Sequence, residues 1–556
     1  MDVIQPLLKA ALGFLIAVAT VRIASFLSKG WEVRTGLRKL QKEGQPMNPH
    51  SLLMGHLLDA KTAGEELPPG AHSNYVLNRM AARLGNPEAF YFDPWPVADP
   101  MLVVTDQYLA EQVTSHHLSG GFKPPSLTRW FAPISGRGGR NLFVQNGQEW
   151  KRDHETFLPW FSNSNLDSTL PAVIDEMLIF RDILRQKAQS KDMIRLEPFT
   201  LRLMNDIIGR VIFNTELKNQ TSDTPHPLSQ YMIRQLDSKF QENDAVQQIG
   251  RLSPLYKLSV WNNGRNLDRE ITTQINRRVD ALRAAKWQGE SSSSSMLDRV
   301  LTEYFSKPER QRVGTVDTEF MKMLVCQLRL LFFAGYDSTS STMIVLCYII
   351  WAHPEVLAKL RAEHDDVFGR NVESCAGQIV DNPAILNSLS YTNAVIKEAM
   401  RLLPPASGVR QGCRDLVLRG RDGAEYPTDG YVVNTNHMGV MRNPKTWPRP
   451  LEFLPERFLV GPGHELYPPK GAWRPFENGL RTCTGQAFVL KELRAFLALV
   501  VREFDFKEAY DEAFAGENID LTGVYGEKAY LIEAGSAHPR GEFPCRVVSS
   551  GCCNER

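Results

Sequence analysis

The sequence has few cysteines, and its charges nearly cancel. Eight of the 556 residues are cysteines, and their positions show no disulfide-framework spacing. This argues against a small secreted scaffold and favours a reducing compartment. The net charge is +1, so composition gives no sign of a nucleic-acid partner. No internal repeat of about 20 to 50 residues is visible, which argues against a repeat array.

A dinucleotide-binding motif is lacking too. No Gly-x-Gly-x-x-Gly follows a predicted strand, and the glycines of residues 136–140 are too irregular to count. The chain therefore shows no flavin or nicotinamide domain of its own. Electrons from NADPH would have to arrive through a separate protein.

One apolar run, residues 7–27, lies near the N-terminus. Its uncharged part, 10–21, is shorter than the roughly 20 residues of a membrane span, but the run reaches that length if Arg22 extends toward the headgroups. We expect residues 1–28 to form a single-pass membrane anchor and 29–50 a basic, proline-containing linker, with the rest in the cytosol. A cleaved signal and a helix lying in the membrane interface are the alternatives.

The richest chemistry lies in residues 475–485, Pro-Phe-Glu-Asn-Gly-Leu-Arg-Thr-Cys-Thr-Gly, which precede a predicted helix at 486–503. Cys483 would lie at the N-terminus of that helix, where free N–H groups and the helix dipole favour the thiolate. Gly479 and Gly485 would let the backbone bend and a flat group approach closely. A lone cysteine is nevertheless more often a buried structural residue.

The spacing in this stretch is more specific than the cysteine alone. Phe476, Gly479, Arg481, Cys483 and Gly485 fill the five fixed positions of Phe-x-x-Gly-x-Arg-x-Cys-x-Gly. This pattern resembles the haem-binding loop of the cytochrome P450 family. The resemblance implies that Cys483 is the axial ligand of the iron of haem b, with Phe476, Arg481 and Gly485 beside the cofactor.

Residues 318–351 form the longest apolar segment predicted to be helical. Because this segment carries Lys322, Arg329 and Asp337, a buried central helix fits it better than a second membrane span. Glycine and several hydroxyl residues at 335–342 are unfavourable in a helix and can bend it by bonding back to carbonyl groups.

Within that segment, Ala334, Gly335, Asp337, Ser338 and Thr339 resemble the family pattern [Ala/Gly]-Gly-x-[Asp/Glu]-Thr-Thr. The resemblance implies that Asp337, Ser338 and Thr339 relay protons to bound dioxygen. Ser338 stands where the first threonine is usual, and it keeps the hydroxyl but loses the β-branch that restricts its rotamers.

Two further sites match family positions that contact the haem propionates. Trp150 and His154 lie four residues apart, on one face of a predicted helix, in place of the family's Trp-x-x-x-Arg. An imidazole binds a carboxylate more weakly than a guanidinium does. Arg410 stands where many family members place a second propionate contact.

Glu398 and Arg401 share a face of the helix predicted at 386–403. Alone, such a pair is common and worth little. Followed by Arg457 and Cys483 in the family order, however, it implies a buried salt-bridged set that locks the haem-loop region.

The resemblance covers nearly the whole chain and implies the cytochrome P450 fold, which is mainly α-helical with small β-sheets. We expect one haem domain over residues 51–548 and a disordered tail at 549–556. Four segments are candidate pocket walls: the stretch 118–140, read as a long irregular loop, Phe333 with Ala334, residues 406–409, and the turn at 524–525.

The implied activity is that of a microsomal monooxygenase that inserts one oxygen atom from O2 into a lipophilic molecule. NADPH–cytochrome P450 reductase is the expected partner, with cytochrome b5 as a second donor, at the endoplasmic reticulum membrane. A specialised metabolite such as a polyketide, terpenoid or alkaloid is the favoured substrate, in the manner of fungal members, and a fatty acid or sterol is the alternative. The rivals are a haem-thiolate isomerase or dehydratase without a reductase, against which Asp337 and its neighbouring alcohols argue, and a membrane-tethered haem sensor.

Overall fold

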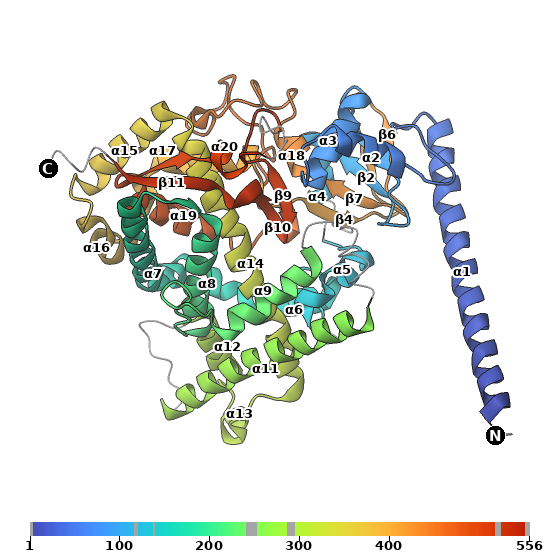
Figure 1. Ribbon diagram of the computed structural model, residues 1–556, viewed down its shortest axis with the longest axis horizontal. Coiled ribbons are helices and arrows are strands. Elements are labelled where there is room, and N and C mark those ends of the chain that lie inside the picture. Colours follow the sequence, from blue (N-terminus) through green and yellow to red (C-terminus); the bar gives the residue numbers. More distant parts are fainter. Residues whose placement is uncertain are drawn as a thin grey trace.

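The structure is a computed structural model that describes residues 4–115, 121–136, 139–240, 253–285, 295–516 and 524–550. Helices dominate, and the small sheets gather in the upper half of the view in Figure 1. The α-helices are α1 (Ile4–Lys42), α2 (Leu57–Glu65), α3 (Ser73–Arg83), α4 (Gln107–Ser115), α5 (Pro125–Ser135), α6 (Gly147–Phe157), α7 (Asn163–Ser190), α8 (Glu197–Phe213), α9 (Pro227–Phe240), α11 (Pro254–Ala284), α12 (Met296–Tyr304), α13 (Pro308–Val313), α14 (Thr318–Trp351), α15 (Pro354–Phe368), α16 (Ser374–Asp381), α17 (Ser390–Leu402), α18 (His437–Met441), α19 (Gln486–Val500) and α20 (Tyr510–Ala513).

Short 3-10 helices and four small sheets complete the described part of the chain. The 3-10 helices are η1 (Leu158–Phe161), η2 (Pro383–Ser388), η3 (Pro455–Phe458), η4 (Gly479–Arg481) and η5 (Arg540–Glu542). The strands are β1 (Ala89–Phe92), β2 (Met101–Val104), β3 (Met193–Arg195), β4 (Gly408–Gln411), β5 (Val417–Arg419), β6 (Glu425–Pro427), β7 (Val432–Thr435), β8 (Phe504–Glu508), β9 (Leu531–Ala534), β10 (Ser536–Pro539) and β11 (Pro544–Ser549).

The largest sheet has the strand order β1-β2-β7-β4, in which only the β2–β7 pair is parallel. The others pair as β10-β9, β3-β11-β8 and β5-β6. This combination of many helices with small sheets agrees with the expected fold class.

The central helix is α14, and its sequence explains its position. The Asp317 side chain accepts a hydrogen bond from the N–H of Phe320 and so caps the first turn. The apolar segment that follows is long enough to cross a membrane, yet 78% of its most apolar window is buried inside the protein. It packs against α8, α5 and the β9–β10 hairpin. The expected core helix is confirmed.

The first helix differs from the expected arrangement. Its apolar part, from Leu12 onward, is fully exposed and of spanning length, and α1 stands apart from the body over most of its length (Figure 1). The boundary expected at residue 28, however, falls inside α1. Residues 29–50 are not a free linker, because Leu37, Leu40 and Met47 are buried against the largest sheet. These three residues are apolar and are spaced so that they can be buried together. The basic residues between them obscured this apolar face in the sequence.

Two other expectations need correction. The described part of 118–140 is not irregular, because α5 occupies Pro125–Ser135 and includes Trp130 and Phe131; residues 118–120 and 137–138 lie outside the described residues. A proline is tolerated in the first turn of a helix, which allows Pro125 to begin α5. The tail expected from residue 549 is ordered at its start, since Ser549 belongs to β11 and the Ser550 N–H bonds to the Glu503 carbonyl. Residues 551–556 are outside the described residues.

Candidate active site

The cysteine loop is built as the sequence predicts. The Cys483 N–H donates to the Phe476 carbonyl (2.9 Å), which closes the loop around η4, and α19 begins at Gln486. Phe476 is half-buried and packs beside Trp473, with ring centroids 5.8 Å apart. Of the six cysteines that the structure describes, Cys483 is the only exposed one. The loop therefore presents a thiol rather than burying it in the core.

The two glycines of this loop differ in what they do. Gly479 has φ +76°, and a Cβ there would collide with the Thr114 carbonyl, so glycine is required. Gly485 has an ordinary φ of −79° and directly precedes α19. A Cβ on Gly485 would lie 3.8 Å from the Cys483 sulfur, an ordinary contact. The chain turns at Thr484 and Gly485 before α19 begins, but the φ of Gly485 is one that other residues adopt as readily. What is particular to Gly485 is the lack of a side chain beside the sulfur.

The electrostatics of Cys483 also differ from the simple helix-dipole argument. The Cys483 side chain is open on one side, but the protein atoms packed around the sulfur keep water from it and raise the pKa of the thiol. The N–H groups of Gly485 and Gln486 act in the opposite direction. The protein alone does not hold a thiolate at this position. A metal cation at the sulfur would, since a coordinating thiol is deprotonated.

Arg481 joins the cysteine loop to α6. Its guanidinium donates to the Leu142 and Gln145 carbonyls (3.3 and 2.8 Å) and lies 4.6 Å from the ring centroid of Trp150. Trp150 in turn stacks on His154, with ring centroids 4.6 Å apart. Burial and the charge of Arg481 lower the pKa of His154, so this ring is neutral at pH 7. His154 can donate a hydrogen bond to a carboxylate but does not bring a charge.

Two more cations lie near Arg481. Strand β4 buries Arg410, and Lys123 is buried with its ammonium 3.3 Å from the Val409 carbonyl. Burial together with the charges of Arg410 and Arg481 lowers the pKa of Lys123 well below its usual value. Burial, reinforced by Arg410, also lowers the pKa of Arg481 to about 9. Sequence reasoning did not identify Lys123, and the cation-rich, glycine-rich character of 121–140 was the available signal.

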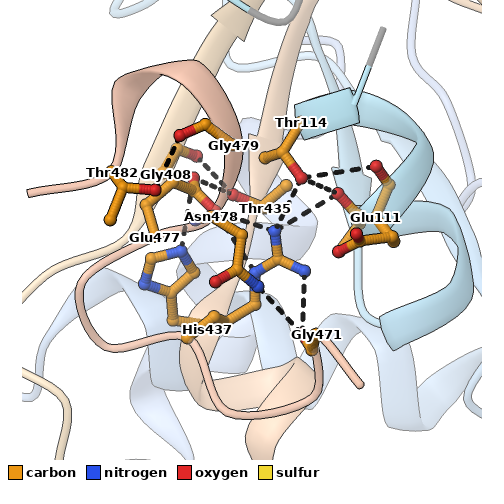
Figure 2. A network of polar contacts seen from close by, with 12 residues as sticks. Glu111, Thr114, Gly408, Thr435, His437, Gly471, Glu477, Asn478, Gly479 and Thr482 are labelled. Atoms are coloured by element: carbon orange, nitrogen blue, oxygen red, sulfur yellow. Dashed lines mark hydrogen bonds and ion pairs between the residues drawn. The ribbon is translucent and has the colours of Figure 1, made fainter. Parts of the chain in front are cut away.

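The carboxylate that faces these cations belongs to Glu477, and it also contacts several other polar side chains. It accepts from the Thr435 hydroxyl (3.1 Å), and Figure 2 shows it beside His437 as well. The Arg474 guanidinium donates to it at 2.8 Å, and Arg410 lies 3.6 Å away. Burial alone would raise the pKa of Glu477, but these cations hold it well below its usual value. The cluster of Lys123, Arg410 and Arg481 therefore keeps an excess of positive charge.

The structure brings Glu398, Arg401 and Arg457 together in one ion cluster with no exposed surface. α17 carries the first two, and Arg401 donates twice to the Glu398 carboxylate (2.7 and 2.9 Å). Arg457, on η3, donates to the same carboxylate at 3.1 Å. Further Arg401 bonds reach the carbonyls of Met441, Pro450 and Glu452. The cluster ties α17 to the segment that leads into the cysteine loop.

The three relay candidates on α14 point in different directions. Ser338 is half-buried, and its hydroxyl donates back to the Ala334 carbonyl (3.2 Å). Thr339 is fully buried, and its hydroxyl finds no partner among the described residues. Asp337 is buried and accepts from the Ser536 N–H (2.7 Å), with His538 also in contact. Asp337 is thus engaged with the β9–β10 hairpin, which the sequence did not reveal.

The residues present fit a haem group. Ala334 is exposed although its neighbours on the central helix, Phe333 and Tyr336, are buried, and Cys483 is exposed on its loop. An opening onto α14 and an accessible thiol suit a flat group with a metal ion. The excess cations at Lys123, Arg410 and Arg481 suit its two propionate carboxylates.

The candidate pocket walls differ in what the structure packs them against. Phe131 of α5 meets Phe333 of α14, with ring centroids 6.3 Å apart, so α5 covers the central helix. The turn at 524–525 instead packs with Tyr525 against Tyr75 and Arg442. The turn at Gly535 lies against α14 at Asp337.

Comparison with known proteins identifies the family. The cytochrome P450 family model matches residues 77–521. The cytochrome P450 monooxygenase polC of Polytolypa hystricis is 34% identical over 97% of this chain and 95% of its own length. The chain belongs to the cytochrome P450 family. With a monooxygenase so similar over both whole chains, it is a cytochrome P450 monooxygenase, and family membership implies haem as the cofactor.

Other members of the P450 family extend the comparison. The cytochrome P450 monooxygenase acrF of Aspergillus aculeatus is 28% identical over 88% of this chain and 98% of its own. The crystal structure of the cytochrome P450DA haem domain matches with a TM-score of 0.69 at 18% identity, covering 92% of this chain and 98% of that one. At this identity the likeness shows the fold alone, and the predicted P450 fold is confirmed.

Proposed function

We propose that this P450 inserts one oxygen atom from O2 into a lipophilic specialised metabolite, using electrons that a membrane-bound reductase takes from NADPH. The observation that carries the proposal is the single exposed cysteine within the five-position loop, beside a buried cluster with excess positive charge. Relatives named as monooxygenases in fungi support the same reaction class.

Each residue of the site then has a role. Cys483 would hold the haem iron through its thiolate, and the N–H groups of Gly485 and Gln486 would moderate the charge of the sulfur. Arg481, Arg410 and Lys123 would bind the propionates, while His154, stacked on Trp150, would add a neutral donor. The bound haem would supply the oxygen chemistry, with thiolate donation favouring O–O cleavage. Asp337 and Ser338 deliver protons as a positioned relay.

The membrane and the electron donor complete the proposal. The exposed apolar part of α1 is the anchor, inserted in the endoplasmic reticulum membrane with the body in the cytosol. Because the sequence has no dinucleotide motif, NADPH–cytochrome P450 reductase is the donor, and cytochrome b5 is a second one. A substrate dissolved in the same membrane would meet the enzyme there, which suits terpenoids, polyketides and alkaloids. Fatty acids and sterols remain the alternative substrates.

A haem-thiolate isomerase or dehydratase is the second candidate function. Such an enzyme would need no proton relay, whereas Asp337 is buried and held in place on α14. Purified protein with reductase decides between them. NADPH oxidation stimulated by an added lipophilic compound, with an oxygenated product, is expected. Rearrangement of a lipid hydroperoxide without NADPH would overturn the monooxygenase proposal.

The ligand assignment has its own test. Cys483→Ala should remove the thiolate-type absorption band of the ferrous carbon monoxide complex, because no other exposed cysteine lies in the described residues. Cys413→Ala is the matched control, since Cys413 is half-buried and lies outside the loop. A band that survives in Cys483→Ala and vanishes in Cys413→Ala would contradict the assignment.

A further inference from the structure

The β9–β10 hairpin folds onto the relay turn of α14 at very short range. Its turn residue Gly535 has φ +111°, and a Cβ there would lie 3.0 Å from the Asp337 carboxylate, so only glycine fits. The next residue, Ser536, donates its N–H to that carboxylate (2.7 Å). One turn further along α14, the Ser341 hydroxyl donates to the Ala537 carbonyl. The hairpin therefore fixes the position of Asp337.

His538, on the same hairpin, lies between two carboxylates. Its Nε2 is 3.4 Å from Asp337 Oδ1, and its Nδ1 contacts Glu197 Oε1 at the start of α8. The Ser536 hydroxyl is 3.0 Å from Nε2. The exposed fractions of His538, Asp337 and Glu197 are 2%, 4% and 7%. An imidazole thus bridges the relay acid of α14 to a second buried acid.

The charges around this imidazole favour its protonated form. Burial opposes the charge, but Glu197 and Asp337 together raise the pKa of His538 well above its usual value. Beyond Glu197 lie Glu542 and Tyr510, whose pKa values are raised by burial and by the negative charge of Glu197. Glu542 is exposed to solvent.

We propose that His538 is a positioning residue that holds Asp337 and supplies each proton that Asp337 gives up, with Glu197 stabilising the imidazolium. The inference rests on the proposed monooxygenase function. Asp337 receives the Nε2 proton of the imidazolium and releases it toward the active site. The ring is left neutral with its other proton on Nδ1, which stays hydrogen-bonded to the Glu197 carboxylate. The imidazolium forms again when a proton from solvent reaches Nε2 through the Ser536 hydroxyl. One proton enters for each one released, and no electrons move.

A purely structural role explains the arrangement less well. The described part of the chain holds no group of three His, Cys, Asp or Glu side chains arranged as a metal site, so the three side chains are not ligands of an ion. An ion pair with a purely structural role is best made with a cation that stays charged, as in the pair of Arg401 with Glu398. An imidazole can instead give and regain a proton near neutral pH.

The test compares wild-type holoenzyme, supplied with reductase and NADPH, with His538→Gln. His364→Gln is the matched control, because His364 is a fully buried histidine bonded to Thr392 whose pKa burial lowers to about 3. Lauric acid, ergosterol and geranylgeraniol serve as probes, and the one with the highest turnover is used throughout. Three quantities are measured: turnover, its ratio in H2O and D2O, and the thermal midpoint between pH 6 and 9.

A proton path predicts a combined change. Turnover of His538→Gln falls about tenfold, less than the roughly 10²–10⁴-fold of a group that transfers the proton directly, because His538 acts through Asp337. The H2O/D2O ratio rises. His538 has a raised pKa in the folded state, so its stabilisation is complete below the unfolded pKa and is lost as pH rises through the folded value. The midpoint difference between wild type and variant should therefore be largest at pH 6 and shrink toward pH 9. His364→Gln should show neither effect.

The outcomes separate the two proposals. No NADPH-dependent product from wild type with any probe defeats the monooxygenase proposal and the path with it. Product from wild type together with an unchanged isotope ratio in His538→Gln defeats the path alone, even if the midpoint falls. If His538→Gln does not fold, Glu197→Gln, which keeps the ring, replaces it under the same criteria.

Discussion

Two buried ion clusters of this P450 have opposite compositions. The cluster of Glu398, Arg401 and Arg457 has one carboxylate and two guanidiniums, and the arginines also bond backbone carbonyls on the segments they join. The cluster of Glu197, His538 and Asp337 has two carboxylates and one imidazole. The cations of the first cluster are guanidiniums, whereas the cation of the second is an imidazole, a group that exchanges its proton far more readily.

This difference matches where each cluster lies. The arginine cluster ties α17 to the segment before the cysteine loop, where a fixed geometry would suit the proposed iron ligand. The histidine cluster contacts Asp337 of α14, the proposed relay acid. Three predictions, in order of expected size, test whether this contrast between a fixed and a titrating cluster holds.

Glu398→Gln should have the largest effect. It leaves the guanidiniums of Arg401 and Arg457 buried without their carboxylate, which costs about 3–5 kcal/mol of the free energy of unfolding. The loss should be the same at pH 6 and pH 9, because the cluster contains no imidazole. Chemical denaturation at both pH values measures it.

The matched control is Glu456→Gln on neighbouring η3, whose ion pair with Lys359 is largely exposed. Its loss should stay below about 1 kcal/mol. Equal losses of unfolding free energy in the two variants would show that the buried cluster stabilises the fold no more than an exposed ion pair does.

Glu197→Gln should come second, at about 1–3 kcal/mol, the cost of removing one partner from a buried charged group. Unlike the Glu398 variant, its loss should depend on pH. Glu197 helps raise the pKa of His538, so the stabilisation it provides is present at pH 6 and fades as the imidazole deprotonates at higher pH. Denaturation curves at pH 6, 7.5 and 9 measure the slope, and a loss that is flat across them contradicts a titrating cluster.

Thr339→Val should have the smallest effect, within about 1 kcal/mol, because the hydroxyl it removes is buried without a partner. Product formed per NADPH should be unchanged. Ser338→Ala is the comparison: its hydroxyl lies at the half-buried edge of the relay turn, so product per NADPH should fall severalfold while stability changes little. The reverse pattern would transfer the relay role to Thr339.

Local motifs predicted more of the site than composition did. The cysteine loop and the Glu398–Arg401 pair each depend on residues close in sequence, and the structure forms both. Arg457, which is 59 residues from Glu398, joins that pair only through the fold. Lys123 and His538 were missed because each acts on residues far away in the chain: Arg410 and Arg481 for Lys123, and Asp337 for His538. Helix α5 and the packed end of α1 were missed because proline, glycine and basic residues concealed their apolar faces.

By itself, the sequence determined the family and the central helix, and it gave the proposed iron ligand, because spacing along one loop or one helix face is a local property. Only the tertiary structure decided which charges share a buried volume. Burial changes what a charge does: it leaves Lys123 among cations that a pair of propionates would balance, and it turns His538 into the bridge between two acids. Such effects depend on which side chains are brought within a few ångströms, and chain order does not specify that.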